Sequence, residues 1–213
     1  MKLYTMARSS AAFRARIALN LKGLSYESIP KALVKNEHRT PEYLALNPQG
    51  FIPALEMDDG TVLSQSLAIA EYLDELHPEP RFLPTDPLAR AQVRSMALAI
   101  ACDIHPLNNL RVLNYLRNEL AQDEDAVTAW YRHWIEQGFR ALETLAREHS
   151  HARRYLFADS VSLADICLVP QMFNARRFHV DVSSFPTLVA ISAHLESLPA
   201  FAAARPDAQP DAA

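Results

Sequence analysis

The pattern of apolar positions changes twice within the first thirty residues. A short, partly apolar run at 2–6 predicts a buried strand, and apolar side chains then recur every four residues over 13–21, which is the spacing of one helix face. Gly23 is placed to end that helix in a left-handed conformation, and 24–30 predicts a second strand. A strand, a helix and a strand in close succession predict a parallel βαβ unit with a right-handed crossover.

A second group of elements follows before residue 77. A short helix is expected over 41–46, with a proline at its first position. The Asp58-Asp59-Gly60 turn lies between the apolar runs 51–57 and 61–63, which is a strong hairpin signal. Ser66 is predicted to be the N-cap of an amphipathic helix that follows. The order βαβαββα predicts an α/β, thioredoxin-like domain.

Beyond residue 77 the pattern is helical. Four prolines within 78–87 predict a linker, so the expected domains are 1–80 (α/β) and 88–213 (all helical). Pro106 predicts a break near 102–106 in the first long helical stripe. Further helices are expected over 125–150, after a capping box at Ser162 and Asp165, and over 186–198, with a loosely held tail beyond them.

Composition and charge exclude several classes of protein. The 213 residues carry a net charge of −4, which argues against a nucleic-acid binder. No apolar run approaches the about 20 residues that span a bilayer, and the N-terminus does not resemble a signal peptide. Cys102 and Cys167 lie in apolar helical stretches and are expected to be buried free thiols, as in a cytoplasmic protein. No Cys or His spacing indicates a metal site.

The first candidate site is Arg8-Ser9-Ser10, directly before the first helix. Two hydroxyls and free backbone N–H groups would meet the positive end of a helix dipole there, where a thiolate is stabilised. The alternative is an ordinary N-cap serine.

Two further candidates lie in the same predicted domain. A cis proline at Ile52-Pro53 would expose the main chain of Ile52 to an extended peptide, whereas a trans proline at a strand edge would have no such role. Gln65-Ser66 at a helix start could bind a carboxylate through a backbone N–H and a hydroxyl, or could be a plain cap.

Two polar groups stand out in the helical part. The segment from Asp103 to Arg111 brings a histidine, two asparagines and a guanidinium to the predicted helix break, although a lone histidine is more often structural. Arg176-Arg177 follows an apolar helix, and exposed surface arginines are the simpler interpretation.

Together these motifs resemble the zeta class of glutathione transferases, which includes maleylacetoacetate and maleylpyruvate isomerases, over nearly the whole chain. The matching segments are 8–10 with 14–23, 45–49 with 52–55, 65–69 with 71–73, 103–109, 163–165 with 168–171, 177–178 and 209–211.

The resemblance implies the glutathione transferase fold, with glutathione as cofactor and a helical domain that covers the substrate. It assigns Ser9, Ser10 and Arg8 to catalysis. The residues it implies for glutathione are Ser9, Ser10, His38, Ile52, Gln65, Ser66, His105 and Asn109, and those for substrate carboxylates are Arg8, Arg111 and Arg177. Ala11 stands where many members have a cysteine, which removes any role for a protein thiol at that position.

The implied reaction is the isomerisation of maleylacetoacetate to fumarylacetoacetate by reversible thiolate addition to the cis double bond. Alternatives are maleylpyruvate as the substrate, a general transferase acting on haloacids or other electrophiles, and an idle glutathione-binding module. The expected partners are a small dicarboxylate and a second copy of the chain, with neither nucleic acid nor membrane.

Overall fold

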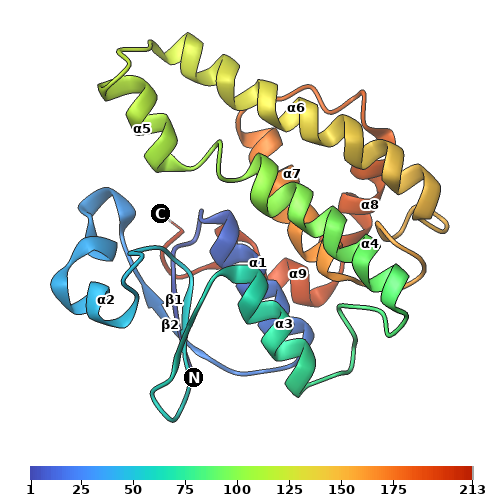
Figure 1. Cartoon of the computed structure of the whole chain (residues 1–213), viewed down its shortest axis with the longest axis horizontal. Helices are drawn as coiled ribbons and strands as arrows, with labels where there is room; N and C mark the ends of the chain where they lie inside the picture. Colours follow the sequence, from blue (N-terminus) through green and yellow to red (C-terminus); the bar gives the residue numbers. More distant parts are fainter. Residues whose placement is uncertain (213) are drawn as a thin grey trace. The chain divides into compact units, whose positions relative to one another are not determined.

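The computed structural model describes residues 1–212, and its first elements form a four-stranded sheet (Figure 1). The strands are β1 (Lys2–Thr5), β2 (Glu27–Pro30), β3 (Ala54–Glu56) and β4 (Val62–Ser64). Their order is β2-β1-β3-β4, with β1 parallel to β2 and antiparallel to β3, and β3 antiparallel to β4. The predicted βαβ unit and hairpin are therefore confirmed.

Three helices belong to this part of the chain. They are α1 (Ser10–Leu21), α2 (Pro41–Leu46) and α3 (Ser66–Leu76), with two short 3₁₀ turns, η1 (Leu33–Lys35) and η2 (Glu37–Arg39), before α2. Figure 1 shows α1 and α3 side by side, and the two helices pack together. Gly23 has φ +65° and follows the last turn of α1, as predicted.

A buried ion pair connects the C-terminal ends of α1 and α3. Lys22 Nζ lies 2.8 Å from the Asp74 carboxylate, and its side chain also covers the ring of Phe82 at 3.9 Å. Both charged side chains are nearly inaccessible to water, and Asp74 also accepts the Phe82 N–H. The pair therefore satisfies groups that would be costly to bury alone.

The following helices are α4 (Pro87–Leu98), the π-helical segment η3 (Ala99–Ile104), α5 (Leu110–Asn118), α6 (Glu124–His149), α7 (Leu163–Arg177) and α8 (Pro186–Glu196). Most of α7 is buried, and it packs against both α4 and α8. Its start follows the prediction, because the Asp165 carboxylate accepts the Ser162 N–H at 2.8 Å and the Ser162 hydroxyl at 2.7 Å. No helix among the described residues is long and apolar enough to cross a membrane.

By packing, the described chain divides into two units. The sheet unit comprises 1–82 and the segment that begins at Ser197, and the helical unit comprises 83–196. The domain boundaries at 80 and 88 stay a prediction, but the segment from Ser197, expected in the helical domain, groups with the sheet unit.

The helix expected from 186 to about 198 is α8, which ends at Glu196. It is not the last helix as expected: α9 (Pro199–Ala204) follows and starts at a proline, which lacks the N–H that a continuous helix requires. Two other local predictions are wrong. The tail is not loosely held, because Asp211 accepts a hydrogen bond from Ala7 in the sheet unit. Cys102 is exposed, because it lies in η3 on a face away from the buried Ile100 and Ile104; Cys167 is buried as predicted.

Candidate active site

Ser9 lies at the N-cap of α1, where its hydroxyl oxygen accepts the Ala12 N–H at 3.2 Å. An accepting hydroxyl still has its own proton to donate, so the capping role and the donor role predicted for Ser9 are compatible. Ser10 is buried at the first helical position, and Arg8 is exposed beside Ser9. The N–H groups of the first turn and the helix dipole give this point a positive potential.

The Ile52–Pro53 peptide bond is cis, which resolves the alternative left open by the sequence. Ile52 precedes β3 and lies outside the strand ladder, which begins at Ala54. The carbonyl of the preceding residue, Phe51, accepts the Tyr43 hydroxyl at 2.6 Å and the Asn47 amide at 2.8 Å. These two donors fix the backbone that leads into Ile52.

Gln65 has φ +70° and ψ +115°, an unusual conformation for a residue with a side chain. Gln65 itself occupies the N-cap, so the prediction of Ser66 as the cap is wrong by one residue; Ser66 is the buried first residue of α3. The Gln65 amide donates to the Gln49 side chain at 2.9 Å. The strained conformation thus lies at a helix start, where a carboxylate would meet free N–H groups.

His38 lies in η2, and its Nδ1 is buried without a hydrogen-bond partner among the described residues. Burial, together with the charge of Arg39, lowers the pKa of this histidine. Gly50 has φ +60°, and a Cβ there would lie only 3.0 Å from the His38 carbonyl oxygen. The loop around Gly50 therefore packs closely on His38, and through Gln49 it also reaches Gln65.

In the helical unit, the predicted break between 102 and 106 is a π-helical segment followed by a turn. His105 is half-buried at the end of η3, and the Asn109 side chain caps α5 by accepting the Arg111 N–H at 3.1 Å. Arg111 is exposed on the first turn of α5. The polar residues of this segment therefore lie at the junction of two helices.

One turn of α6 holds that segment in place. The Trp130 indole donates to the Leu107 carbonyl at 2.9 Å, and the Asn108 amide donates to the Tyr131 carbonyl at 3.0 Å. The Tyr131 ring also stacks on Phe178, with ring centroids 3.7 Å apart.

The two consecutive arginines at the end of α7 differ in their surroundings. Arg176 pairs with Glu196 at 2.6 Å, as a surface arginine would. Arg177 instead covers the Phe178 ring at 5.3 Å, and its charge acts on the Tyr131 phenol. Since the Phe178 carbonyl accepts from Arg132 of α6, the same turn of α6 contacts both the 105–109 segment and the end of α7.

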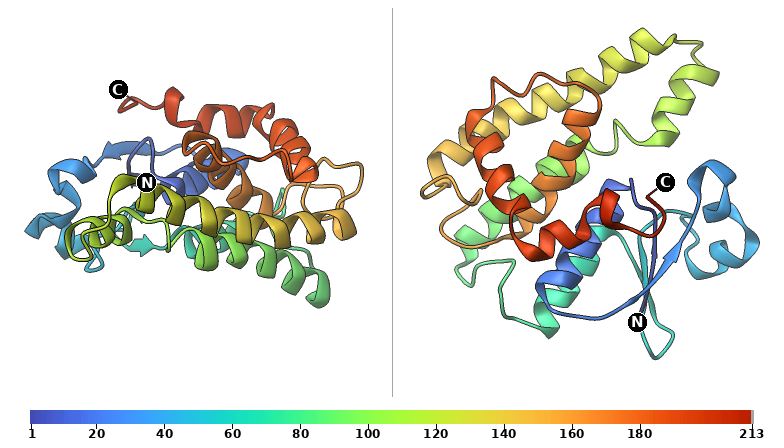
Figure 2. Two further views of the ribbon diagram at one scale, coloured as in Figure 1. Left: turned by 90° about the horizontal axis from the view of Figure 1, so that it is seen from above. Right: turned by 180° about the vertical axis from the view of Figure 1, so that it is seen from behind.

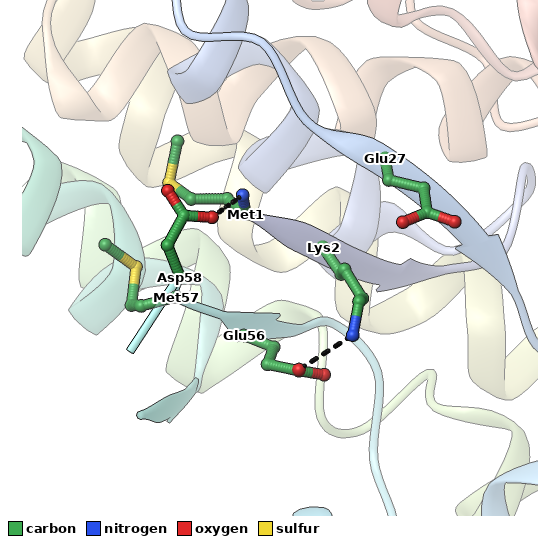
Figure 3. A pocket seen from close by; sticks show the side chains of 6 residues that line it. All are labelled: Met1, Lys2, Glu27, Glu56, Met57 and Asp58. Carbon is green, nitrogen blue, oxygen red and sulfur yellow. Dashed lines mark hydrogen bonds and ion pairs between the residues drawn. The ribbon is translucent and has the colours of Figure 1, made fainter. Parts of the chain in front are cut away.

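Other polar groups of the sheet unit are less suitable for stabilising a thiolate or binding a carboxylate. The Tyr4 hydroxyl donates to Glu56 at 2.7 Å, which raises the pKa of Tyr4 to about 12. A cavity of about 240 Å³ at the start of β1 is lined by three carboxylates (Figure 3). In it Lys2 pairs with Glu56 at 2.9 Å, and the excess of negative charge would repel an anionic ligand. Among residues 1–212 no cluster of His, Cys, Asp or Glu is arranged to hold a metal ion.

Several residues that shape these sites were missed in the sequence. Asn47 and Gln49 act through side-chain hydrogen bonds to Phe51 and Gln65, and Gly50 acts through close packing on His38. Trp130 and Tyr131 act across an interhelical contact. Only Gly50 had a usable signal, since glycine in a loop indicates a positive φ.

Fold and site together define a glutathione transferase. Residues 1–75 match the family model "Glutathione S-transferase, N-terminal domain". The maleylacetoacetate isomerase of Pseudomonas aeruginosa is 47% identical over 213 residues, covering 99% of this chain and 98% of that protein. The chain belongs to the zeta class of this family, the class of the maleylacetoacetate and maleylpyruvate isomerases, and it is an enzyme.

Two solved structures are similar over their whole length. The holo structure of a maleylpyruvate isomerase, described as a bacterial zeta-class glutathione transferase, is 47% identical, with a TM-score of 0.97 and 100% of both chains covered. The maleylacetoacetate isomerase of Anaeromyxobacter dehalogenans 2CP-1, with dicarboxyethyl glutathione and citrate in its active site, is 40% identical, with a TM-score of 0.87; 100% of this chain and 97% of that chain are covered.

Proposed function

We propose that the enzyme isomerises maleylacetoacetate to fumarylacetoacetate with glutathione as cofactor. The observation that carries the proposal is the Ser9 hydroxyl, which caps α1 as an acceptor and keeps its proton for a thiolate. A free thiol has a pKa of about 8.5, so the site must favour the thiolate at neutral pH, and a hydroxyl donor at a helix N-terminus does so.

The residues of the sheet unit fit glutathione. The main chain of Ile52, outside the strand ladder, would pair with the cysteinyl unit, and Gln65 with Ser66 would bind the γ-glutamyl carboxylate at the start of α3. The orphaned Nδ1 of His38 would find an acceptor in the glycyl end if it carries the proton. His105 and Asn109 of the helical unit are proposed as further contacts. When bound, glutathione supplies a thiolate that adds reversibly to the cis double bond and is not consumed.

The arginines bind and orient the substrate in this proposal. Arg111 and Arg177 each have a forked guanidinium that matches a carboxylate, and both are exposed in the structure. Arg8 adjoins Ser9 and would stabilise the negative charge that develops on the substrate's oxygen. With the two ends held, the central bond would still be free to rotate once thiolate addition has made it a single bond.

The ligand of one relative supports this chemistry. Dicarboxyethyl glutathione, present in the active site of the Anaeromyxobacter enzyme, is glutathione with a dicarboxyethyl group. A thiolate gains such a group by adding to an enedioate, which is the substrate class proposed here.

A second candidate substrate is maleylpyruvate. It presents an enedioate to the same arginines, and the similar structure with a TM-score of 0.97 is a maleylpyruvate isomerase.

The decisive experiment follows the loss of enol absorbance of each substrate in a coupled assay that consumes the trans product, with and without glutathione. Turnover that requires glutathione without consuming it, and that falls at least about tenfold in kcat/KM in Arg111→Ala, is expected, because a charge-assisted pair contributes roughly 1.5–3 kcal/mol. Arg117→Ala is the matched control, since Arg117 lies on the same helix and pairs with Glu124. Conjugation of haloacids without isomerisation, or no glutathione-dependent reaction at all, would refute the proposal.

We also propose that the enzyme is a homodimer, as the resemblance implies, and that it is cytoplasmic, as two free thiols indicate. Analytical ultracentrifugation should then give twice the chain mass of 23.9 kDa, and a monomer would contradict it.

A further inference from the structure

The segment after α9 returns to the turn that precedes Ser9. The Asp211 carboxylate accepts the Ala7 N–H at 2.8 Å, a contact between residues 204 positions apart in sequence. The right view of Figure 2 shows α9 beside α1, and the two helices pack together. Residues near the end of the described chain therefore contact the backbone two residues before the proposed catalytic serine.

The other side of the same turn is held by Arg16, which is fully buried on α1. Its Nη2 donates to the Ala7 carbonyl at 2.9 Å, and its Nη1 donates to the Met6 carbonyl at 3.2 Å and to the Thr5 hydroxyl at 2.9 Å. Nε donates to the carbonyl at the end of α9, at 3.0 Å. Both main-chain polar groups of Ala7 are thus held, the N–H by a carboxylate and the carbonyl by a guanidinium.

The negative charge of Asp211 stabilises the protonated state of the buried Arg16. Burial lowers the pKa of Arg16 to about 10, so the guanidinium remains protonated at neutral pH, and the negative charge of Asp211 favours that state. A buried cation of this kind is tolerated only when its hydrogen bonds and its charge are satisfied. Loss of Asp211 would therefore remove one hydrogen bond from Ala7 and one favourable charge from Arg16.

The turn at Thr5–Ala7, which Arg16 and Asp211 contact, leads directly into Ser9, the N-cap of α1. The Ser9 N–H donates to the Met6 carbonyl at 3.1 Å, and that carbonyl is one of the acceptors of Arg16. The position of the Ser9 hydroxyl is therefore linked to the turn by one hydrogen bond. A small displacement of a catalytic group can reduce the rate strongly, so the rigidity of this turn matters for catalysis.

We propose that Asp211 and Arg16 are positioning residues that fix Thr5–Ala7 and thereby aim the Ser9 hydroxyl at the glutathione sulfur. That the Ser9 hydroxyl donates to the glutathione sulfur rests on the proposed function. That Asp211 and Arg16 fix the turn at Thr5–Ala7 does not. Asp211 does not touch the reacting atoms in this proposal and acts through Ala7 and Ser9.

The experiment compares Asp211→Ala and Asp211→Asn with Asp207→Ala as the matched control. Asp207 lies in the same segment, but its carboxylate pairs with the neighbouring Arg205 at the surface. Amide hydrogen exchange at Ala7–Ser10 is measured without glutathione, and the pKa of bound glutathione is then measured from the ultraviolet absorbance of its thiolate.

In Asp211→Ala, exchange at Ala7 should be about tenfold faster, as expected for the loss of a hydrogen bond to a charged acceptor. The pKa of the bound thiol should rise by about one unit toward its free value. Asp211→Asn retains an acceptor oxygen but loses the charge, so both quantities should lie between those of Asp211→Ala and the wild type. Asp207→Ala should match the wild type in both.

Unchanged exchange in the Asp211 variants would overturn the proposal, as would faster exchange with an unchanged thiol pKa, because the contact would then be only structural. If Asp211→Ala does not fold, the proposal is overturned instead when Asp211→Asn has the same amide exchange rate and the same thiol pKa as the wild type. If the wild type itself binds no glutathione thiolate, the proposed function fails, while the exchange result still tests whether Asp211 fixes the turn.

Discussion

At the scale of single residues, the main feature is one side chain with two roles. Ser9 accepts a hydrogen bond as the cap of α1 and is proposed to donate one to sulfur. The two roles can be separated because glycine is nearly as good an N-cap as serine, costing only a few tenths of a kcal/mol, and has no hydroxyl.

We therefore expect Ser9→Gly to keep the stability of the protein within about 0.5 kcal/mol of the wild type. The pKa of bound glutathione should nevertheless rise by about one to two units, because the hydroxyl donor is lost. Urea unfolding and ultraviolet titration of the bound thiol measure the two effects. Ser9→Thr keeps both the cap and the hydroxyl and is the control; a normal thiol pKa in Ser9→Gly would exclude the donor role.

Asp165 gives a second prediction, for stability against pH. This fully buried carboxyl accepts from the Leu156 N–H at 2.7 Å and from Ser162, yet burial raises its pKa to about 6. Since its unfolded value is about 3.9, the folded state binds more protons between these values, and the free energy of unfolding falls as the pH rises through that range.

The free energy of unfolding of the wild type minus that of Asp165→Asn should thus decrease by about 2 kcal/mol between pH 4 and pH 7. The asparagine variant does not titrate at this position, so the difference isolates Asp165 from other groups. Urea unfolding of both proteins across this range measures it. A difference that is constant, or that increases with pH, would show that the hydrogen bonds outweigh burial.

At the scale of elements, η3 packs against α6, and the Ile104 side chain fills the space beside Gly138. A Cβ on Gly138 of α6 would lie 2.2 Å from Ile104 Cδ1 and 2.4 Å from its Cγ1. Ile104 directly precedes His105, and the following Leu107 and Asn108 are hydrogen-bonded to Trp130 and Tyr131 of α6. Gly138 therefore allows the π-helical segment to seat against α6 and fixes where the 105–111 segment lies.

Gly138→Ala should destabilise the helical unit by about 1–3 kcal/mol, although alanine is the better helix former. The displaced 105–111 segment should raise KM for the dicarboxylate more than it lowers kcat. In Gly138→Ala with Ile104→Ala both clashing atoms are absent, so KM should recover at least partly, whereas Ile104→Ala alone controls for the cavity. Failure of the double variant to improve on Gly138→Ala would argue against steric positioning.

At the scale of the whole molecule, the sequence predicted those features that depend on local chemistry. The βαβαββα order, the Gly23 terminus and the helix break at Pro106 all follow from periodicity or from one residue's backbone preference. The return of Asp211 to Ala7, the α6 contacts of the 105–109 segment and the grouping of α9 with the sheet unit depend on pairs distant in sequence. Nothing local indicates such pairs, which is why the tail was wrongly expected to be loose.

The last prediction concerns the linkage of glutathione to global stability. A ligand at 100 times its Kd stabilises the folded state by about 2.7 kcal/mol. Gln65 has φ +70° and is proposed to bind the γ-glutamyl end. In Gln65→Gly the strain of positive φ is relieved, while the unfolded chain gains entropy, so the stability without glutathione should change by less than about 1 kcal/mol.

The glutathione-induced increase, by contrast, should fall by at least half in Gln65→Gly, because the side chain that binds the γ-glutamyl group is gone. Urea unfolding with and without glutathione measures both quantities on the same protein. Gln122→Gly is the control, since Gln122 lies in an exposed loop of the helical unit and its amide donates to the nearby Leu120 carbonyl. If glutathione increases the stability of Gln65→Gly and of the wild type equally, the γ-glutamyl group binds away from Gln65. If Gln65→Gly loses this increase but has normal stability without glutathione, the strained conformation of Gln65 serves binding rather than folding.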